Sequence, residues 1–423
     1  MSFQQGLSGL NAASKNLEVI GNNVANANTF GSKSARAEFA DMYASALNNA
    51  SVTNIGIGVN MSTVAQQFTQ GNITATANPM DIAINGPGFF QVTDGVNPPM
   101  YSRNGQFKVD KDGFLVNNQR QKLIGYPADA QGVIQPGQSG PVQLSTAGIA
   151  PSATARIRLE ANLDAREAIT LPAAGAQIEF NDSKTFNNST SVTAYDAKGQ
   201  DVVLSYYFQK AGPDSWNVYV AANGTSVLDD GATTPVPLPV TTIQFPTNGG
   251  APLSPVGPVA FTVPATTNAV GALTVPITGV MLDLGGTTQY GSSFGITDLS
   301  QDGFASGQLT GFGIEDAGVL MARYSNGQSK AAGQLELATF RNPQGLVPKG
   351  GNAWASSFAS GTPVAGVPGQ GNLGVLQAGA LEESNVDLTG ELVSMITAQR
   401  VYQANAQTIK TQDQVLQTLV NMR

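Results

Sequence analysis

The distribution of proline is the feature that most constrains how this 423-residue chain can fold. The first proline is Pro79 and the last is Pro368, so two proline-free ends enclose a proline-containing centre. Proline breaks a helix because it removes a backbone hydrogen bond and clashes with the preceding turn. We therefore expect long helices at the two ends of the chain and mainly other structure between them.

The front end carries a helical pattern of apolar residues. Alternating steps of four and three connect Phe3, Leu7, Leu10, Ser14, Leu17, Gly21 and Val24, and most of these side chains are apolar. Such a pattern predicts one face of an amphipathic helix. The helix should end within residues 21–31, where Asn and Gly tolerate left-handed backbone and compete with helical hydrogen bonds.

The same spacing returns at the far end. It connects Leu388, Leu392, Met395, Gln399, Tyr402, Ala406, Ile409, Asp413, Leu416 and Val420. No Gly or Pro interrupts residues 391–423. We expect a helix over residues 388–421, about 50 Å long, with Asp387 as its N-cap and Glu391 at the positive end of the helix dipole.

The remaining faces of this second helix are rich in uncharged amides. They carry Gln403, Asn405, Gln407, Gln412, Gln414 and Gln417. Amide side chains can contact neighbouring chains or line a wet channel without the cost of burying charge. Periodicity alone leaves two alternatives open: assembly with other chains, or an antiparallel two-helix hairpin within one molecule.

The centre has the alternation of β-strands. Residues 80–92, 107–118, 201–208 and 216–224 alternate apolar and polar side chains between Gly, Asn and Asp turns, which predicts mostly antiparallel β structure. Residues 231–282 contain no charged residue and nine prolines. We expect short strands joined by loops there.

The composition argues against most kinds of catalytic site. The chain has no Cys and no His, which removes thiol nucleophiles, imidazole bases and the commonest transition-metal ligands. The net charge of −8 makes nucleic acid a poor partner. Only 12% of the residues are charged, which favours surfaces that meet other protein. We therefore expect no cofactor and no metal. We also expect no membrane insertion, because no apolar run approaches ~18 residues.

Two local patterns resemble small functional sites. Asp110, Asp112 and Gly113 are reminiscent of a calcium loop, but the further ligands are missing, and Asp-Gly between alternating strands indicates a hairpin turn. Glu382 and Glu383 could form an acid and base pair. Adjacent carboxylates beside a helix start are more often solvated or directed at the helix dipole, so we expect no catalytic role.

Four blocks of the sequence resemble a known family in the same order. They are SGLNAASKNLEVIGNNVANANTFGSK, FADMYASAL, NPMDIAINGPGFFQV with YSRNGQFKVDKDGFLVNNQRQKLIGYP, and GALEESNVDLTGELVSMITAQRVYQANAQTIKTQDQVLQTLVNMR. These blocks resemble the flagellar axial proteins of the bacterial rod and hook. The resemblance covers residues 1–145 and 285–423, and its signature residues here are Asn22, Asn23, Asn26, Asn28, Asn385 and Asp387.

The resemblance implies an α+β protein of several domains. A terminal α-helical coiled-coil domain would use residues 1–70 and 360–423, an inner β domain residues 71–145 and 285–359, and an outer β domain residues 146–284. Subunits would assemble through the apolar side chains of the two terminal helices, namely Phe3, Leu7, Leu10, Leu17, Val24, Leu388, Leu392, Met395, Tyr402, Ile409, Leu416 and Val420.

Within the family, the large middle segment favours a hook subunit. The hook is a hollow helical homopolymer that joins rod to filament. Its implied partners are rod, hook cap and hook-filament junction proteins and the type III export apparatus, and its implied location is extracellular, reached without a cleaved signal peptide. Residues 46–56 look longer than the usual hook linker, which keeps a distal rod subunit as the alternative. A secreted β-rich binding protein or hydrolase is a third hypothesis, for which the sequence offers no polar cluster.

Overall fold

The chain divides into two compact units. In the computed structural model the described residues are 2–42, 56–145, 147–170, 177–232 and 235–421. The first unit contains both chain ends and the segment Thr310–Arg323, and the second contains Ala147–Leu309 with Tyr324–Gln328. The suspected linker insertion at residues 46–56 lies outside the described residues except for Gly56.

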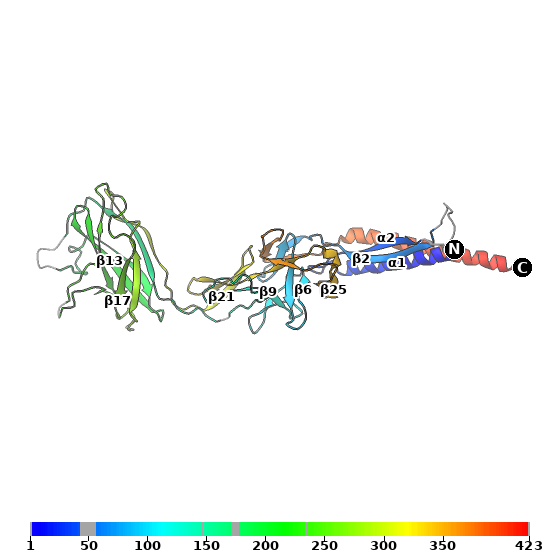
Figure 1. Cartoon of the computed structure of the whole chain (residues 1–423), viewed down its shortest axis with the longest axis horizontal. Coiled ribbons are helices and arrows are strands. Elements are labelled where there is room, and N and C mark those ends of the chain that lie inside the picture. The colour runs from blue at the N-terminus through cyan, green and yellow to red at the C-terminus, as the bar shows by residue number, and fades with distance from the viewer. Residues whose placement is uncertain (1, 43–55, 146, 171–176, 233–234, 422–423) are drawn as a thin grey trace. The chain divides into compact units, whose positions relative to one another are not determined.

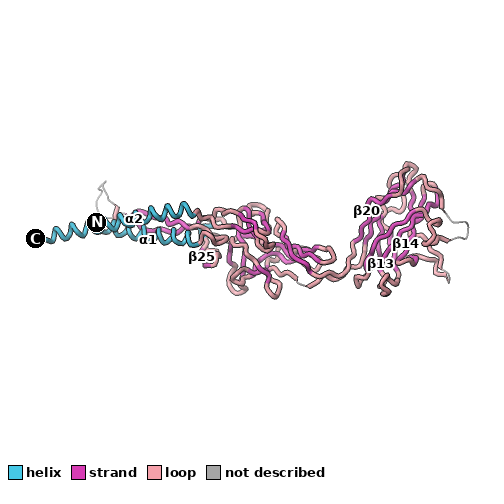
Figure 2. Tube along the Cα trace, turned by 180° about the vertical axis from the view of Figure 1, so that it is seen from behind, coloured by secondary structure: helices cyan, strands magenta, loops and turns pink. Residues whose placement is uncertain are grey.

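The two predicted terminal helices are both present in the first unit. Helix α1 (Ser2–Ala25) ends inside the predicted window, and helix α2 (Leu388–Asn421) matches the predicted range. The Oδ1 atom of Asp387 accepts the backbone N–H of Thr389 at 3.0 Å, which confirms the expected N-cap. The two helices lie side by side (Figures 1 and 2). Neither combines the length and hydropathy of a membrane span, as far as the structure describes them.

The rest of the first unit is built from short strands. Before the second unit these are β1 (Ala35–Met42), β2 (Gly58–Gln66), β3 (Ile73–Ala75), β4 (Ile82–Asn85), β5 (Phe89–Thr93), β6 (Met100–Ser102), β7 (Lys108–Val109), β8 (Leu115–Val116), β9 (Lys122–Pro127) and β10 (Gly140–Pro141). After it come β21 (Leu309–Ile314), β22 (Val319–Tyr324), β23 (Ser329–Leu335), β24 (Leu337–Thr339), the 3₁₀ turn Pro343–Gly345, β25 (Val347–Gly350), β26 (Ala353–Ala355), β27 (Val364–Gly366), β28 (Val375–Ala378) and β29 (Ala380–Glu382).

Strands from both halves of the chain form one core in this unit. The main sheet runs in the order β21-β22-β23-β9-β5-β6-β26-β25. Strands β29 and β28 return to pair with β3 and β4. The core buries Phe90 and Phe107, whose ring centroids lie 5.1 Å apart, and a second cluster places Trp354 beside Phe89. The chain termini are therefore tied to the same β scaffold.

The predicted turn at Asp110 is confirmed. It connects β7 and β8, which pair antiparallel. The Oδ1 atom of Asp110 accepts the backbone N–H groups of Asp112 and Phe114 at 3.0 and 2.8 Å, and Gly113 has a φ of +85°, a conformation that suits glycine. The carboxylate is used to hold the turn.

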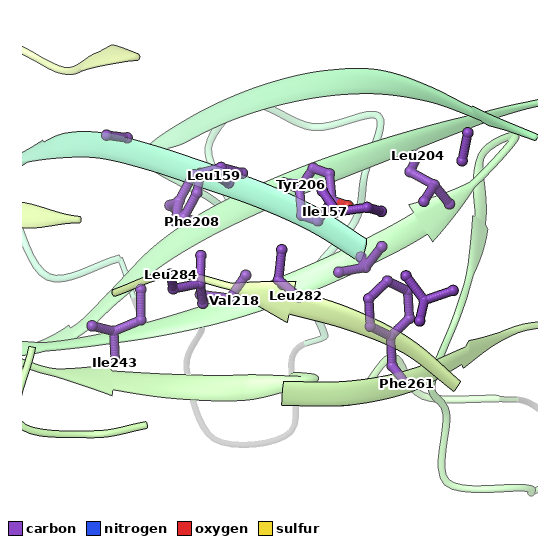
Figure 3. Packing of buried hydrophobic residues seen from close by; sticks show 14 of the residues in the cluster. Ile157, Leu159, Leu204, Tyr206, Phe208, Val218, Ile243, Phe261, Leu282 and Leu284 are labelled. Atoms are coloured by element: carbon purple, nitrogen blue, oxygen red, sulfur yellow. The ribbon is translucent and has the colours of Figure 1, made fainter. Parts of the chain in front are cut away.

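The second unit is a β sandwich. Its strands are β11 (Arg156–Asp164), β12 (Asn188–Tyr195), β13 (Asp201–Gly212), β14 (Ser215–Ala222), β15 (Thr225–Ser226), β16 (Thr241–Gln244), β17 (Val259–Val263), β18 (Ile277–Asp283), β19 (Thr288–Tyr290) and β20 (Gly295–Gln301). One sheet contains β17-β18-β11-β19 with β20, and the other contains β12-β13-β14-β15 with β16. Figure 3 shows Leu159, Phe208 and Leu282 meeting in the core between them.

Most strands of this unit pair antiparallel, as the sequence predicted, and β11 also pairs parallel with β18 and β19. One domain boundary differs from what the family resemblance implied. Residues 285–309 would belong to the inner domain by that resemblance, yet β19 and β20 pair with β11 of the second unit. Only the pairing of distant strands decides this, because residues on either side of the boundary have the same local β pattern.

A candidate assembly site at the chain ends

Helices α1 and α2 form an antiparallel pair that approaches closely at small residues. A Cβ atom added to Gly6 would lie 3.1 Å from Cγ1 of Ile409, and one added to Gly9 would lie 2.8 Å from Oδ1 of Asn405. Glycine permits this approach because it has no side chain. Near the other end of the pair, Asn23 contacts Glu391. The intramolecular hairpin that periodicity left open is therefore present.

The face of α1 that is buried within the single chain is not the predicted stripe. Gly6, Ala13 and Ile20 are buried, each seven residues after the last. Phe3 and Leu7 are exposed. Leu10, Leu17 and Val24 are half-buried. The small residues Gly6 and Gly9 face α2, whereas the large apolar residues at the start of α1 remain exposed in the single chain.

Helix α2 buries little of its apolar surface against α1. Ala398 is its one buried hydrophobic residue among those described, and Met395 and Ile409 are half-buried. The exposed apolar side chains of the helix are Leu388, Leu392, Val393, Ile396, Val401, Tyr402, Val415, Leu416 and Val420. So many exposed apolar residues along one helix mark a surface for contact with other protein.

The signature residue Asn23 connects both chain ends to the β structure. Its Oδ1 atom accepts the backbone N–H of Ala35 at 2.9 Å, and its amide donates to the carbonyl of Ala35 at 2.8 Å. The same amide also donates to Glu391 at 2.9 Å. This buried side chain thus fixes α1 against β1 and against the first turn of α2.

Asn385 makes the corresponding connection just before α2. Its Oδ1 atom accepts the N–H of Ser34 at 2.7 Å, and its amide donates to the carbonyl of Gln67 at 2.8 Å. Asn26 donates to the carbonyl of Asn22 at 3.0 Å and so closes the end of α1. Asn28, Asn385 and Asp387 line a polar cleft of about 720 Å³.

A buried charge cluster lies next to these asparagines. The carboxylate of Glu382 accepts hydrogen bonds from Nζ of Lys33 at 2.5 Å, from Nη1 of Arg103 at 3.1 Å and from the backbone N–H of Gly71 at 3.0 Å. The side chains of Lys33 and Glu382 are fully buried, and that of Arg103 is nearly so. The expectation that Glu382 is solvated or directed at the helix dipole is therefore wrong.

The cluster buries two cations and one anion. Burial lowers the pKa of Lys33, against the opposing attraction of Glu382. Burial likewise lowers the pKa of Arg103. Glu382 is 349 residues from Lys33 and 279 from Arg103. No spacing rule applies to partners that far apart, which is why sequence reasoning missed the cluster.

Comparison with known families identifies the chain. Family models match in chain order: "Flagella basal body rod protein" over residues 3–33, "Flagellar hook protein FlgE/F/G D1 domain" over 83–183, "Flagellar basal body protein FlaE D2 domain" over 162–304 and "Flagellar basal body rod FlgEFG protein C-terminal" over 377–422. The flagellar hook protein FlgE of Salmonella typhimurium is 39% identical over 425 residues, with all of both chains covered. The chain belongs to the flagellar hook protein family.

Other hook proteins extend the match. FlgE of Escherichia coli K12 is 39% identical over 428 residues, again over both whole chains. FlgE of Rhizobium meliloti is 32% identical over 435 residues, which cover all of this chain and 98% of that one. The crystal structure of Helicobacter pylori flagellar hook protein FlgE2 has a TM-score of 0.53 at 14% identity and covers 73% of this chain and 100% of that chain. That last likeness concerns the fold alone.

Membership in the hook protein family decides between the hypotheses. The chain is a structural subunit of the bacterial flagellar hook, and the distal rod alternative is not favoured. The middle of the chain, which the family resemblance did not cover, matches the D2 domain over residues 162–304. That range also includes β19 and β20.

Proposed function

We propose that the chain polymerises helically, through its terminal helices, into a hollow and flexible hook tube. The tube transmits torque from the rod to the filament and lets exported subunits pass. The subunit acts by assembly and has no catalytic activity. The apolar residues of the two predicted stripes are its contacts with neighbouring copies, and the division into terminal, inner and outer domains belongs to the same proposal.

The exposed apolar surface of α2 is the observation that supports this proposal best. The side chains of Leu392 and Leu416 are 49% and 54% exposed although both belong to the apolar stripe. Helix α2 has 34 residues and α1 has 24, so α1 is too short to cover the whole length of α2. Neighbouring copies of the helices would remove this apolar surface from water.

The partners and location follow from family membership as part of the proposal. The ends of the polymer would contact rod, hook cap and hook-filament junction proteins. The subunit would leave the cell through the flagellar type III apparatus without a cleaved signal peptide and would function outside the cell. The low content of charged residues suits a chain whose surfaces are mostly occupied by other protein.

Charge placed on the exposed stripe should stop assembly without unfolding the subunit. Leu392→Asp or Leu416→Asp would bury an unpaired carboxylate at every contact between neighbouring copies, at a cost of several kcal/mol. Electron microscopy of concentrated protein should show tubes for the unchanged chain and dispersed subunits for both variants. Circular dichroism should be the same for all three, because the altered side chains are exposed in the monomer.

Gln407→Asp is the matched control for this experiment. It places the same charge on an exposed amide of the same helix, outside the apolar stripe. We expect this variant to form tubes. Normal tubes from Leu392→Asp and Leu416→Asp would contradict the assignment of the stripe, and dispersed subunits from the unchanged chain would contradict the proposed function.

A further inference from the structure

A fully exposed aromatic side chain stands out in the β part of the first unit. The relative exposure of Phe358 is 105%, so the ring is covered by no other part of the described chain. The aromatic rings nearest in sequence behave differently, since Trp354 and Phe340 are both buried in the aromatic cluster. Exposure of a whole aromatic ring is unfavourable in water.

The loop that presents Phe358 is tightly held. The hydroxyl of Ser357 donates to the carbonyl of Gly345 at 2.5 Å, and the side-chain amide of Asn342 donates to the carbonyl of Ala359 at 3.0 Å. Ser360 is buried and donates to the carbonyl of Ser357 at 2.8 Å. A ring on a fixed loop loses little conformational entropy when it binds. The exposure of Phe358 is therefore built into the fold.

The surrounding sequence carries no charge. Residues 350–381 contain no Asp, Glu, Lys or Arg, and Lys349 and Glu382 bound the segment. Val364 and Val375 of this segment are also exposed. Interface cores are depleted in charged residues and enriched in aromatic ones, and a few aromatic anchors supply most of the binding energy. Residues 350–381 have that character.

The partner that best fits this surface is a second copy of the chain. Every copy has a net charge of −8, so contact between copies is favoured where charged side chains are absent. One protruding ring that inserts into a different surface of the next copy makes a head-to-tail contact. Contacts of that type build open helical polymers, whereas two-fold contacts close as dimers.

We propose that Phe358 is an anchor residue in the contact between neighbouring subunits. This inference rests on the proposed polymerisation and adds a contact on the β part of the first unit, separate from the terminal helices. The ring is fully exposed in the free subunit and becomes buried in the tube. It lies in the uncharged segment 350–381, which also contains the exposed Val364 and Val375.

Truncation of the ring tests this contact. Phe358→Ala should raise the critical concentration for tube formation about 30-fold, the size expected for loss of an interface anchor. Val96→Ala is the matched control, because Val96 is an exposed apolar residue of the same unit, lies two positions after the charged Asp94 and is outside the charge-free segment. It should leave the critical concentration unchanged. Thermal unfolding of both variants should match that of the unchanged chain.

A labelling experiment reports burial of position 358 directly, in tubes formed at a concentration high enough to offset the loss of the ring. The chain has no Cys, so Phe358→Cys and Val96→Cys each introduce the only thiol. Iodoacetamide should react with both thiols rapidly in the monomer. In tubes formed above the raised critical concentration, the Phe358→Cys thiol should react much more slowly than in the monomer, while the Val96→Cys thiol should keep its rate.

The outcomes separate this inference from the proposed function. Two outcomes would contradict the anchor role of Phe358 and leave the proposed polymerisation intact. One is tube formation by Phe358→Ala at the normal critical concentration, and the other is a Phe358→Cys thiol that stays reactive in well-formed tubes. If the unchanged chain forms no tubes, the proposed function fails and the anchor fails with it.

Discussion

The second unit and the terminal helix pair bury apolar side chains to very different extents. In the second unit, alternate residues of β13 and β14 point into one core, where Tyr206, Phe208 and Trp216 are completely buried. In α2, one hydrophobic residue among those described is buried, and Val420 is 74% exposed. The first region completes its core within one chain, and the second leaves much of its apolar surface for other molecules.

This difference shows where each region obtains its stability. Two facing sheets bury enough apolar area to offset the conformational entropy lost on folding. A pair of helices with one narrow contact face does so only weakly by itself. We therefore expect the sandwich to withstand changes to the chain ends, and the helix pair to depend on its connection to the β scaffold and on neighbouring copies.

The largest expected effect comes from opening the core of the second unit. Trp216 is fully buried, and its Nε1 donates to Oε1 of Gln289 at 2.8 Å. Trp216→Ala should lower the free energy of unfolding of this unit by about 3–5 kcal/mol. Calorimetry should show a lower unfolding temperature for this unit, and the variant should still form tubes. Val256→Ala, at a residue that is 96% exposed, should leave the transition temperature unchanged. Loss of tube formation in Trp216→Ala would show that the sandwich and the helix pair are not independent.

The next largest effect should come from the charge cluster at the chain ends. Glu382→Gln removes the single anion that faces Lys33 and Arg103 and leaves two buried cations uncompensated. The free energy of unfolding of the first unit should fall by about 3 kcal/mol, measured by urea denaturation. Glu18→Gln, in the exposed pair with Lys15, should change it by less than about 0.5 kcal/mol. Equal effects of the two changes would contradict a special role for the buried cluster.

A smaller effect is expected at the start of α2. Asp387→Ala removes the side-chain cap on the N–H of Thr389 and should destabilise the helix by about 1 kcal/mol. Hydrogen exchange of the first-turn amides should become faster while exchange in the second unit stays the same. Asp413→Ala, within the helix, is the control and should not speed that exchange. Unchanged protection in Asp387→Ala would mean that contacts with the β scaffold alone hold the first turn.

The smallest effect concerns a polar atom inside the sandwich. The hydroxyl of Tyr206 is buried and has no hydrogen-bond partner among the described residues, and burial raises its pKa. Tyr206→Phe should leave the second unit unchanged or stabilise it by less than about 1 kcal/mol. By contrast, the hydroxyl of Tyr219 donates to Gln209 at 3.3 Å. Tyr219→Phe should therefore lower the free energy of unfolding of the second unit by about 1 kcal/mol. A clear loss of stability in Tyr206→Phe would contradict the absence of a hydrogen-bond partner for this hydroxyl.

Local patterns predicted the elements but not their contacts. Helix α2 begins at Leu388 and ends at Asn421 as its periodicity and the Asp387 cap indicated, because helix limits depend on neighbouring residues. The buried face of α1 was missed because Gly6 and Ala13 do not count as large apolar residues, although their small size is what admits α2. Hydrophobic patterns identify surfaces that could be buried and do not say which partner covers them.

The sequence by itself determined the two terminal helices, the β-rich centre, the turn at Asp110 and membership in a family of flagellar axial proteins, because short-range patterns and ordered motifs carry that information. The tertiary structure alone decided that β19 and β20 pair with β11. It also decided that Glu382 pairs with Lys33 and Arg103 and that Phe358 stands uncovered on a fixed loop. Pairing between residues hundreds of positions apart depends on how the whole chain closes, and no local pattern records it.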